Sequence, residues 1–412
     1  MAPYWLMGLA NGTFGLMGGF LVLPLPQLLA AEHVTETRIA AISAACFSWG
    51  IWVFLLGPLL DLRFSRRWYA TAFALLAGAG LAAAILLRAH LAAFEAAIML
   101  AYAAATLSSN ALGGWLATLV PEDDHGGVIE SRLGAWTQVA TLGGNGIMTI
   151  AAGELLREVS PMTAALLLGA LVACPALIFL WMPVPQREVE QARRLASHFG
   201  EFWRQLGSLL KQREVLLTLA LFLAPTGSFS LTNTLGGVAG DFHASEAFVS
   251  RVGGLMLTIA GATGCLLVPV LARRLRPLAL YLGIGAAGCV FTLLMLLPHR
   301  TPTTFAIAFL GENVFQAMSF TAAVAICLRA IGRDNPLAAT EFGLLTAATV
   351  LPISYMGVLD GHSYARGIGG LHGLAGMFAV DGGVSLVACV VMFAVMRWLG
   401  DESRHTSTSN AG

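Results

Sequence analysis

The chain has 412 residues, of which 57% are hydrophobic and 11% are charged, and its 23 basic and 23 acidic residues leave no net charge. Globular domains have about 25% charged residues, so this chain cannot hide its apolar side chains in one water-soluble core. The composition indicates an integral membrane protein, and the balanced charge gives no basic face for nucleic acid.

Twelve apolar runs follow one another along the chain, and most are about as long as the ~20 residues that cross a bilayer as a helix. They cover residues 4–30, 38–60, 69–88, 92–120, 131–156, 161–183, 214–239, 249–271, 277–297, 302–328, 338–361 and 372–398. The predicted fold class is therefore all-α and integral to the membrane, with twelve transmembrane helices in two six-helix halves.

The longest break between runs divides the chain. We expect an N-terminal bundle at 1–184, a cytoplasmic linker with an amphipathic helix at 185–213, a C-terminal bundle at 214–398 and a cytoplasmic tail at 399–412. Prolines inside or near the ends of several runs predict kinks, at Pro24, Pro26, Pro58, Pro175 and Pro352.

A short charged segment joins the second and third runs. It holds Gly57, Asp61, Arg63, Arg66 and Arg67. The arginines are costly in hydrocarbon and should face the cytoplasm. Asp61 then has two interpretations. It forms an ion pair that breaks and re-forms as helices move, or it belongs to a solvated turn whose charge only sets the topology.

Two short echoes relate the halves of the chain. Residues 55–60 resemble residues 266–271 at an offset of 211, and residues 12–16 resemble residues 227–231 at an offset of 215. Two matches at nearly the same offset indicate a chain built from two similar halves.

The basic residues also predict the orientation. If loops alternate between the two sides of the membrane, 17 of the 23 Lys and Arg residues fall on one side. The positive-inside rule places that side in the cytoplasm, together with both termini. We therefore expect a multi-pass protein of the inner (plasma) membrane.

Taken together, these features resemble the major facilitator superfamily, which has nested repeats and a site near the membrane midplane. Three patches resemble one branch, the peptide, acetyl-coenzyme A and drug transporters that include AmpG-type muropeptide permeases. They lie at residues 58–61, at 134–146 and at 339–361. The hinge departs from the superfamily pattern, because Leu62 follows Asp61 and Arg63 is displaced by one position.

The resemblance implies that helices 1, 4, 7 and 10 line a central cavity. Polar residues on or beside these helices are candidates for binding the solute: Asn11, Asn110, Gln138, Ser230, Asn233, Asn313 and Gln316. Each could equally form a hydrogen bond between helices, which is the commoner role of such residues in membranes.

Two acids lie deep in the apolar runs, and a charge there is costly. Glu312 is near the middle of helix 10, and Asp381 is at a similar depth in helix 12. Without a basic residue at this depth, burial favours the neutral acid, so both are candidates for proton coupling. The alternative for Asp381 is a structural hydrogen bond to a neighbouring helix.

Other acids and one histidine fall near outer helix ends, where water is expected to reach them: Glu95, Glu154, Asp241, Asp360 and His362. Glu341 lies near an inner helix end, where it would cap the helix or pair with Arg329 or Arg333.

The predicted function is secondary active transport by alternating access, with proton symport importing a bulky polar solute such as a muropeptide. The alternatives are a siderophore importer or a drug or metabolite exporter of the same fold, and a membrane-embedded transferase. No intramembrane Lys or Arg is present for a phosphate-rich anion, which disfavours acetyl-coenzyme A. We expect a monomer in the lipid bilayer with a small-molecule solute and protons as partners, no nucleic acid, no metal, no cofactor and no enzymatic activity.

Overall fold

The computed structural model describes residues 3–62, 64–120, 127–181, 204, 207–208, 211–227 and 229–409. Within these ranges the chain is helical apart from loops and one isolated bridge between Ile368 and Leu371. Ten helices in the described residues are long and apolar enough to cross a membrane, and a bent pair brings the number to eleven. The all-α membrane fold expected from the sequence is confirmed.

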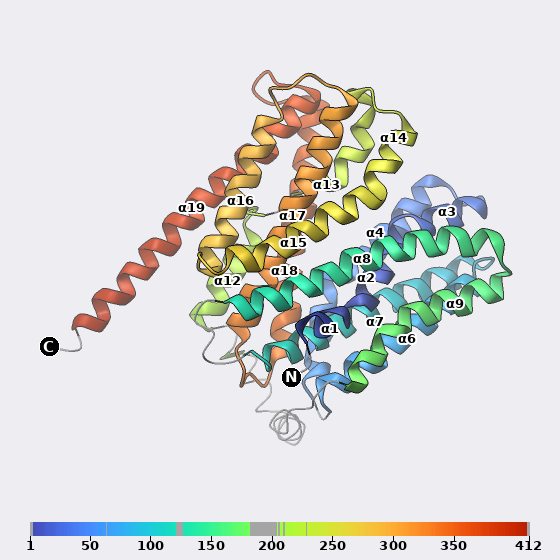
Figure 1. The fold of residues 1–412 in the computed structure, drawn as a ribbon, viewed down its shortest axis with the longest axis horizontal. Helices are drawn as coiled ribbons and strands as arrows, with labels where there is room; N and C mark the ends of the chain where they lie inside the picture. The colour runs from blue at the N-terminus through green and yellow to red at the C-terminus, as the bar shows by residue number, and fades with distance from the viewer. Residues whose placement is uncertain are drawn as a thin grey trace.

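The first half of the chain forms one group of helices (Figure 1). Its elements are α1 (Tyr4–Leu9), α2 (Gly12–Val22), α3 (Pro24–Ala31), α4 (Glu36–Trp52), η1 (Val53–Leu56), α5 (Gly57–Leu60), α6 (Arg66–Leu86), α7 (Leu91–Ala117), α8 (Val128–Glu158), α9 (Pro161–Ala173) and η2 (Cys174–Trp181).

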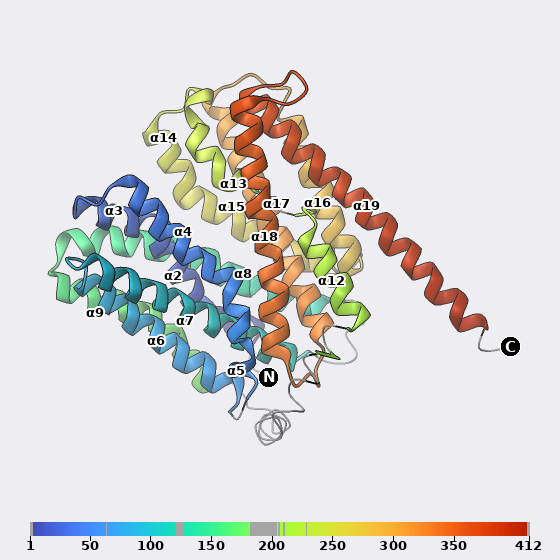
Figure 2. The same cartoon turned by 180° about the vertical axis from the view of Figure 1, so that it is seen from behind.

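The second half forms another group (Figure 2). Its elements are α12 (Arg213–Leu223), α13 (Leu231–Thr234), η3 (Leu235–Phe242), α14 (Glu246–Arg251), η4 (Val252–Met256), α15 (Leu257–Leu271), α16 (Pro277–Leu294), α17 (Pro302–Ile331), α18 (Ala338–Arg366) and α19 (Gly373–Ser409). The expected tail begins inside α19, and most of the expected linker lies outside the described residues.

The seventh run is not one continuous helix, contrary to the sequence-based expectation for 214–239. It breaks after Leu223 and resumes at Leu231, which is why the structure has fewer long apolar helices than the twelve expected. Pro225 explains the break, because it has no N–H to donate and disfavours the helical conformation of the residue before it. Ala224 is accordingly extended, with ψ 146°.

The proline kinks differ in size. The axis bends by 41° between α2 and α3, at Pro24. A 3₁₀ segment leads into Pro58, and another begins next to Pro175. Pro352 lies within α18, which continues through it without a break.

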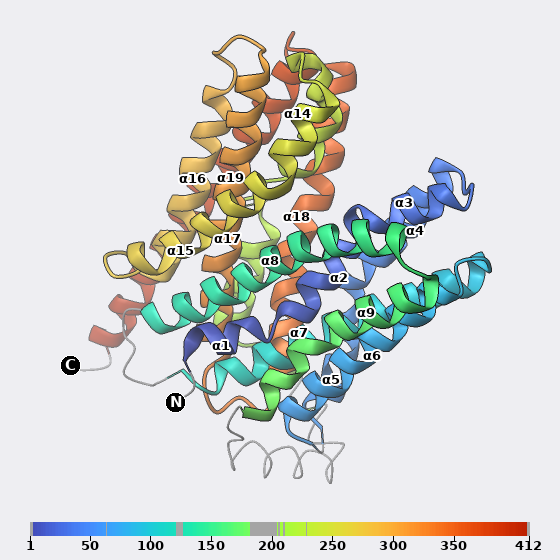
Figure 3. The same ribbon diagram turned by 45° about the vertical axis from the view of Figure 1, so that its right-hand side comes forward.

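The two groups of helices approach each other at one end and diverge at the other (Figure 3). We call these the converging end and the diverging end. The converging end holds α5, the start of α18 and the end of α17, while the diverging end holds the end of α18 and the start of α17. α8 runs along α15 and α17, and α7 contacts α18.

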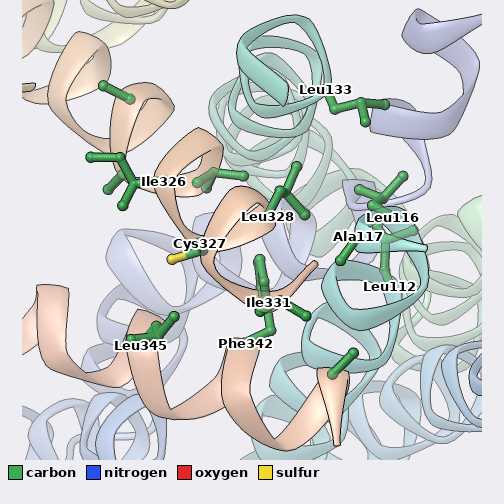
Figure 4. Close-up of a cluster of buried hydrophobic side chains, with 14 of the residues drawn as sticks. Leu112, Leu116, Ala117, Leu133, Ile326, Cys327, Leu328, Ile331, Phe342 and Leu345 are labelled. Atoms are coloured by element: carbon green, nitrogen blue, oxygen red, sulfur yellow. The ribbon is translucent and has the colours of Figure 1, made fainter. Parts of the chain in front are cut away.

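An apolar cluster joins both groups at the converging end. It includes Leu112 and Leu116 of α7, Leu328 of α17 and Phe342 of α18, all buried (Figure 4). Burying apolar area stabilises this contact by roughly 25 cal/mol per Å2, so the cluster favours the closed arrangement.

The close approach of α7 to α18 requires glycine at position 114. A β-carbon there would lie 2.5 Å from the backbone nitrogen of Ala339, which cannot rotate away. We predict that Gly114→Ala opens the converging end, because such overlap costs about 1–3 kcal/mol. The measurement is maleimide labelling of Cys327, which is buried in the cluster, in a chain without the other cysteines.

Labelling of Cys327 should become about tenfold faster in this variant, since 1.4 kcal/mol is a tenfold change. Gly153→Ala is the matched control, because open space surrounds that position. Equal labelling rates in the two variants would contradict the prediction.

Candidate functional site

A buried carboxylate at the converging end connects the two halves. Asp61 follows α5, and its oxygens accept hydrogen bonds from the backbone N–H groups of Ala339 (3.1 Å) and Thr340 (2.9 Å) and from the Thr340 hydroxyl (2.6 Å). These groups form the first turn of α18, where a helix has free N–H groups and a positive dipole end. An acid of the first half therefore caps a helix of the second.

Arg66 completes this contact. Its Nε donates to Asp61 Oδ1 at 2.8 Å, and its Nη2 donates to the carbonyl of Pro336 at 3.0 Å. Both charged side chains are almost fully buried. Asp61 thus lies in a buried ion pair and not in a solvated turn, and the breaking and re-forming of that pair as the helices move stays a prediction.

The other hinge residues have different places. Gly57 lies against Thr340, and a β-carbon there would be 3.0 Å from the Thr340 α-carbon. The Arg67 guanidinium lies 5.3 Å from the centre of the Trp68 ring. Arg63 is outside the described residues.

A second polar region surrounds the break between α12 and α13. Phe229 has φ 43°, a left-handed conformation that is uncommon for a bulky residue and typical of functional sites. Gln316 of α17 holds this segment, because its amide donates to the carbonyl of Phe229 (3.3 Å) and to the hydroxyl of Thr232 (2.8 Å). The residues that lead into α13 are thus tied to α17 by side-chain hydrogen bonds.

Ser230 joins two acids beside this break. Its hydroxyl oxygen lies 3.1 Å from Asp381 Oδ1 and also makes a hydrogen bond with Asp360 Oδ2. All three side chains are buried. The expectation that water reaches Asp360 at a helix end is therefore wrong, because α18 continues to Arg366 and α19 covers this position.

Glu312 is fully buried, and its carboxyl faces a neighbouring helix. The hydroxyl of Thr292 on α16 donates to its Oε1 at 2.5 Å, and its Oε2 has no hydrogen-bond partner. Among the described residues no basic side chain pairs with Glu312, Asp360 or Asp381, and no group of His, Cys, Asp and Glu side chains is placed to hold a metal ion.

The remaining solute candidates do not form one cluster. Asn11 donates to Thr141 within the first half, at 3.0 Å. Asn110 lies beside Gly343 of α18, and Asn313 lies beside Gly261 of α15. Each of these three asparagines is buried with one side-chain atom that has no partner. Gln138 is half-buried on α8, and Asn233 is exposed.

Other charged candidates have local partners. Glu341 is buried and accepts from Asn335 at 2.5 Å; within the described chain it makes no ion pair with Arg329 or Arg333. At the diverging end Glu95 pairs with Arg38, and Asp241 accepts from the Tyr364 hydroxyl at 2.7 Å.

The sequence pattern of the Major Facilitator Superfamily matches residues 7–354. No curated protein sequence matches the chain.

Three similar solved structures share the fold. FucP, a transporter of that superfamily in the outward conformation, has a TM-score of 0.68 at 15% identity, covering 95% of this chain and 99% of its own. A proton:xylose symporter bound to 6-bromo-6-deoxy-D-glucose has a TM-score of 0.66 at 16% identity, and the match covers 95% of this chain and 94% of the symporter. The human organic anion transporter MFSD10 has a TM-score of 0.66 at 15% identity, and the match covers 94% of this chain and 98% of the transporter.

We predict that Asp61→Asn opens the converging end. Asparagine lacks the charge that pairs with Arg66, and its amide hydrogens face the N–H groups of α18. Removing one partner of a buried ion pair costs about 3–5 kcal/mol, so labelling of Cys327 should become at least tenfold faster. Transport should be slower at normal abundance in the membrane, because a conformational equilibrium is shifted.

The matched control is Asp241→Asn, which removes an exposed carboxylate at the diverging end. Labelling and transport should stay at the unmodified level in this variant. Unchanged Cys327 labelling in Asp61→Asn would show that the buried contact does not hold the ends together.

Proposed function

The chain belongs to the major facilitator superfamily of membrane transporters, and from this premise we propose that it is a proton symporter that imports a bulky polar solute by alternating access. One observation carries the proposal. Three acids, Glu312, Asp360 and Asp381, are buried in one half of a transporter without a basic partner among the described residues. An intramembrane acid is costly, and proton binding is the simplest function that explains it.

The contact at the converging end supports alternating access. Asp61 and Arg66 join the halves at the end that carries the basic hinge. If the positive-inside rule holds, this end is cytoplasmic and the arrangement is closed to the cytoplasm. Breaking the contact would open that side, and re-forming it would close the cycle. In this topology both termini are cytoplasmic and the protein lies in the plasma membrane.

Glu312 and Asp381 are the proposed coupling residues. Protonation would remove a charge that is costly in a closed, apolar surrounding and would thereby link proton entry to solute movement. Two structures of similar fold, a proton:xylose symporter and the fucose:proton symporter of E. coli, are of proton-coupled transporters. At 14–16% identity they support the fold of this chain and leave its solute open.

Neutral polar groups are proposed to bind the solute. Asn11, Asn110 and Asn313 each have a buried side-chain atom without a partner, and Gln316 holds the break beside Ser230. Amides bind hydroxyl and amide groups well, which suits a muropeptide. Siderophore import and drug or metabolite export by the same fold are the alternatives. Gln138 and Asn233 complete the proposed set.

We predict that Glu312→Gln abolishes accumulation driven by a pH gradient but preserves exchange of solute, because glutamine resembles the protonated acid. The measurement is uptake of a labelled muropeptide into proteoliposomes with and without an imposed gradient, and a ferric siderophore serves as a second probe. Glu154→Gln, at an exposed position on α8, is the control and should accumulate solute normally.

Two results would argue against the proposal. If Glu312→Gln still concentrates solute under the gradient, Glu312 is not the coupling residue and Asp381 is tested next. If neither probe enters vesicles with the unmodified protein faster than it enters empty vesicles, with or without the pH gradient, the proposed solutes are wrong.

A further inference from the structure

A small cavity separates Glu312 from the acids at the helix break. It is lined by Pro225, Thr226, Gly227, Phe229, Cys289, Thr292, Asp381 and Ser385. The space for the centre of a water molecule is about 10 Å3, which is about the room that one water molecule needs. Two of the lining residues take part in the hydrogen bonds described above: Thr292 bonds to Glu312, and Asp381 bonds to Ser230.

These hydrogen bonds connect the buried acids into two groups, one on each side of the cavity. On one side of the cavity, the Thr292 hydroxyl oxygen lies 2.5 Å from Glu312 Oε1 and 3.0 Å from the carbonyl oxygen of Gly288. Its single hydrogen points to one of these acceptors at a time, so in the relay it points to Glu312. On the other side, Asp381 contacts Ser230, which contacts Asp360. The cavity that Thr292 and Asp381 both line lies between the two hydrogen-bonded groups.

A hydroxyl that the acids do not use also lies at the cavity. Ser385 Oγ has no hydrogen-bond partner in the described chain, and the residue is only 4% exposed. A buried polar atom without a partner is costly unless water or another ligand satisfies it. Ser385 therefore offers a polar group to a water molecule in this space, independently of the acids.

The contacts of Ser230 require a bound proton. Its oxygen is within hydrogen-bonding distance of one oxygen of Asp360 and one of Asp381, but the hydroxyl has a single hydrogen. The second hydrogen bond needs a hydrogen from a carboxylic acid. At least one proton is thus held between the two acids in this arrangement.

The depths of the acids are graded. Asp360 lies six residues before the end of α18, about 9 Å from the diverging end. Asp381 lies eight residues into α19, about 12 Å deep, and Glu312 lies ten residues into α17, about 15 Å deep. The chain of hydrogen bonds therefore leads from the diverging end toward the middle of the membrane.

We propose that Asp360, Ser230, Asp381, one water molecule and Thr292 form a proton relay that carries a proton from Asp360 to Glu312. Each step breaks one O–H bond and forms the next, so a proton that Asp360 takes up at Oδ1, a buried atom without a partner among the described residues, leaves one proton on Glu312. In the part of the protein that the structure describes, the thiols of Cys289 on α16 and Cys389 on α19 also lie beside these hydrogen bonds. The relay rests on the proposed proton symport but specifies its path.

The test follows deuterium into Glu312. Infrared spectra of the purified protein in lipid vesicles record the band of the protonated carboxyl, which Glu312→Gln identifies by its loss. After transfer to heavy water the band shifts at the rate at which Glu312 exchanges its proton. We expect this rate to fall at least tenfold in Ser385→Ala and in Ser230→Ala.

Ser385→Ala is the sharper variant, because its hydroxyl has no protein partner and its loss breaks no internal hydrogen bond. The matched control is Ser363→Ala, a buried serine on α18 whose hydroxyl donates only to the backbone carbonyl of Asp360. The control should exchange at the unmodified rate.

Two outcomes would overturn the relay. One is exchange at the unmodified rate in both Ser385→Ala and Ser230→Ala, and the other is the absence of a Glu312 carboxyl band at every pH where the protein is folded. The experiment needs no solute. If the Glu312 proton exchanges slowly in the variants but solute uptake does not depend on a pH gradient, the relay stands and proton symport is refuted.

Discussion

The arrangement of the two halves depends on a carboxylate placed at the start of a helix from the other half. Asp61 supplies negative charge where α18 has free N–H groups, and Arg66 neutralises the same carboxylate from its own half. Neither half satisfies these groups alone. Because the partners are 278 residues apart along the chain, their pairing fixes how the bundles meet and leaves the diverging end free to separate.

Much of this architecture can be predicted from the sequence. Apolar runs of bilayer length place most helices within a few residues, since in hydrocarbon each span must satisfy its own backbone. The hinge offers an ion pair of Asp61 with an arginine as one of two interpretations, and the charges alone do not choose between them. It does not predict that Thr340 completes the contact, because nothing local to residue 61 indicates a partner so distant along the chain.

The candidate site is harder to predict from the sequence than the fold is. Pro225 and Gly227 mark the break in the seventh helix, but membrane helices tolerate both residue types, so the run was expected to be continuous. The apolar pattern ends at residue 361 and so predicts that Asp360 lies near water, whereas α18 continues to Arg366. Which side of a helix Glu312 faces depends on packing, and spacing alone does not reveal that it meets Thr292.

The helix break brings proposed solute binding and proposed proton binding into one short segment. Gln316 holds the carbonyl of Phe229, and the next residue, Ser230, holds the acids. A solute that engages Gln316 would compete for the same segment that positions Ser230. A change of protonation at Asp360 or Asp381 would in turn alter how firmly that segment is held. Coupling between solute and proton can therefore be local and needs no long pathway.

The apolar cluster at the converging end has a consequence for how the protein responds to temperature. Opening this end exposes Leu112, Leu116, Leu328 and Phe342, and hydrating apolar surface raises the heat capacity. The balance between closed and open forms is then curved in temperature, whereas the Asp61 contact adds little curvature. Cooling weakens apolar burial, so in the cold the closed form rests increasingly on the buried ion pair.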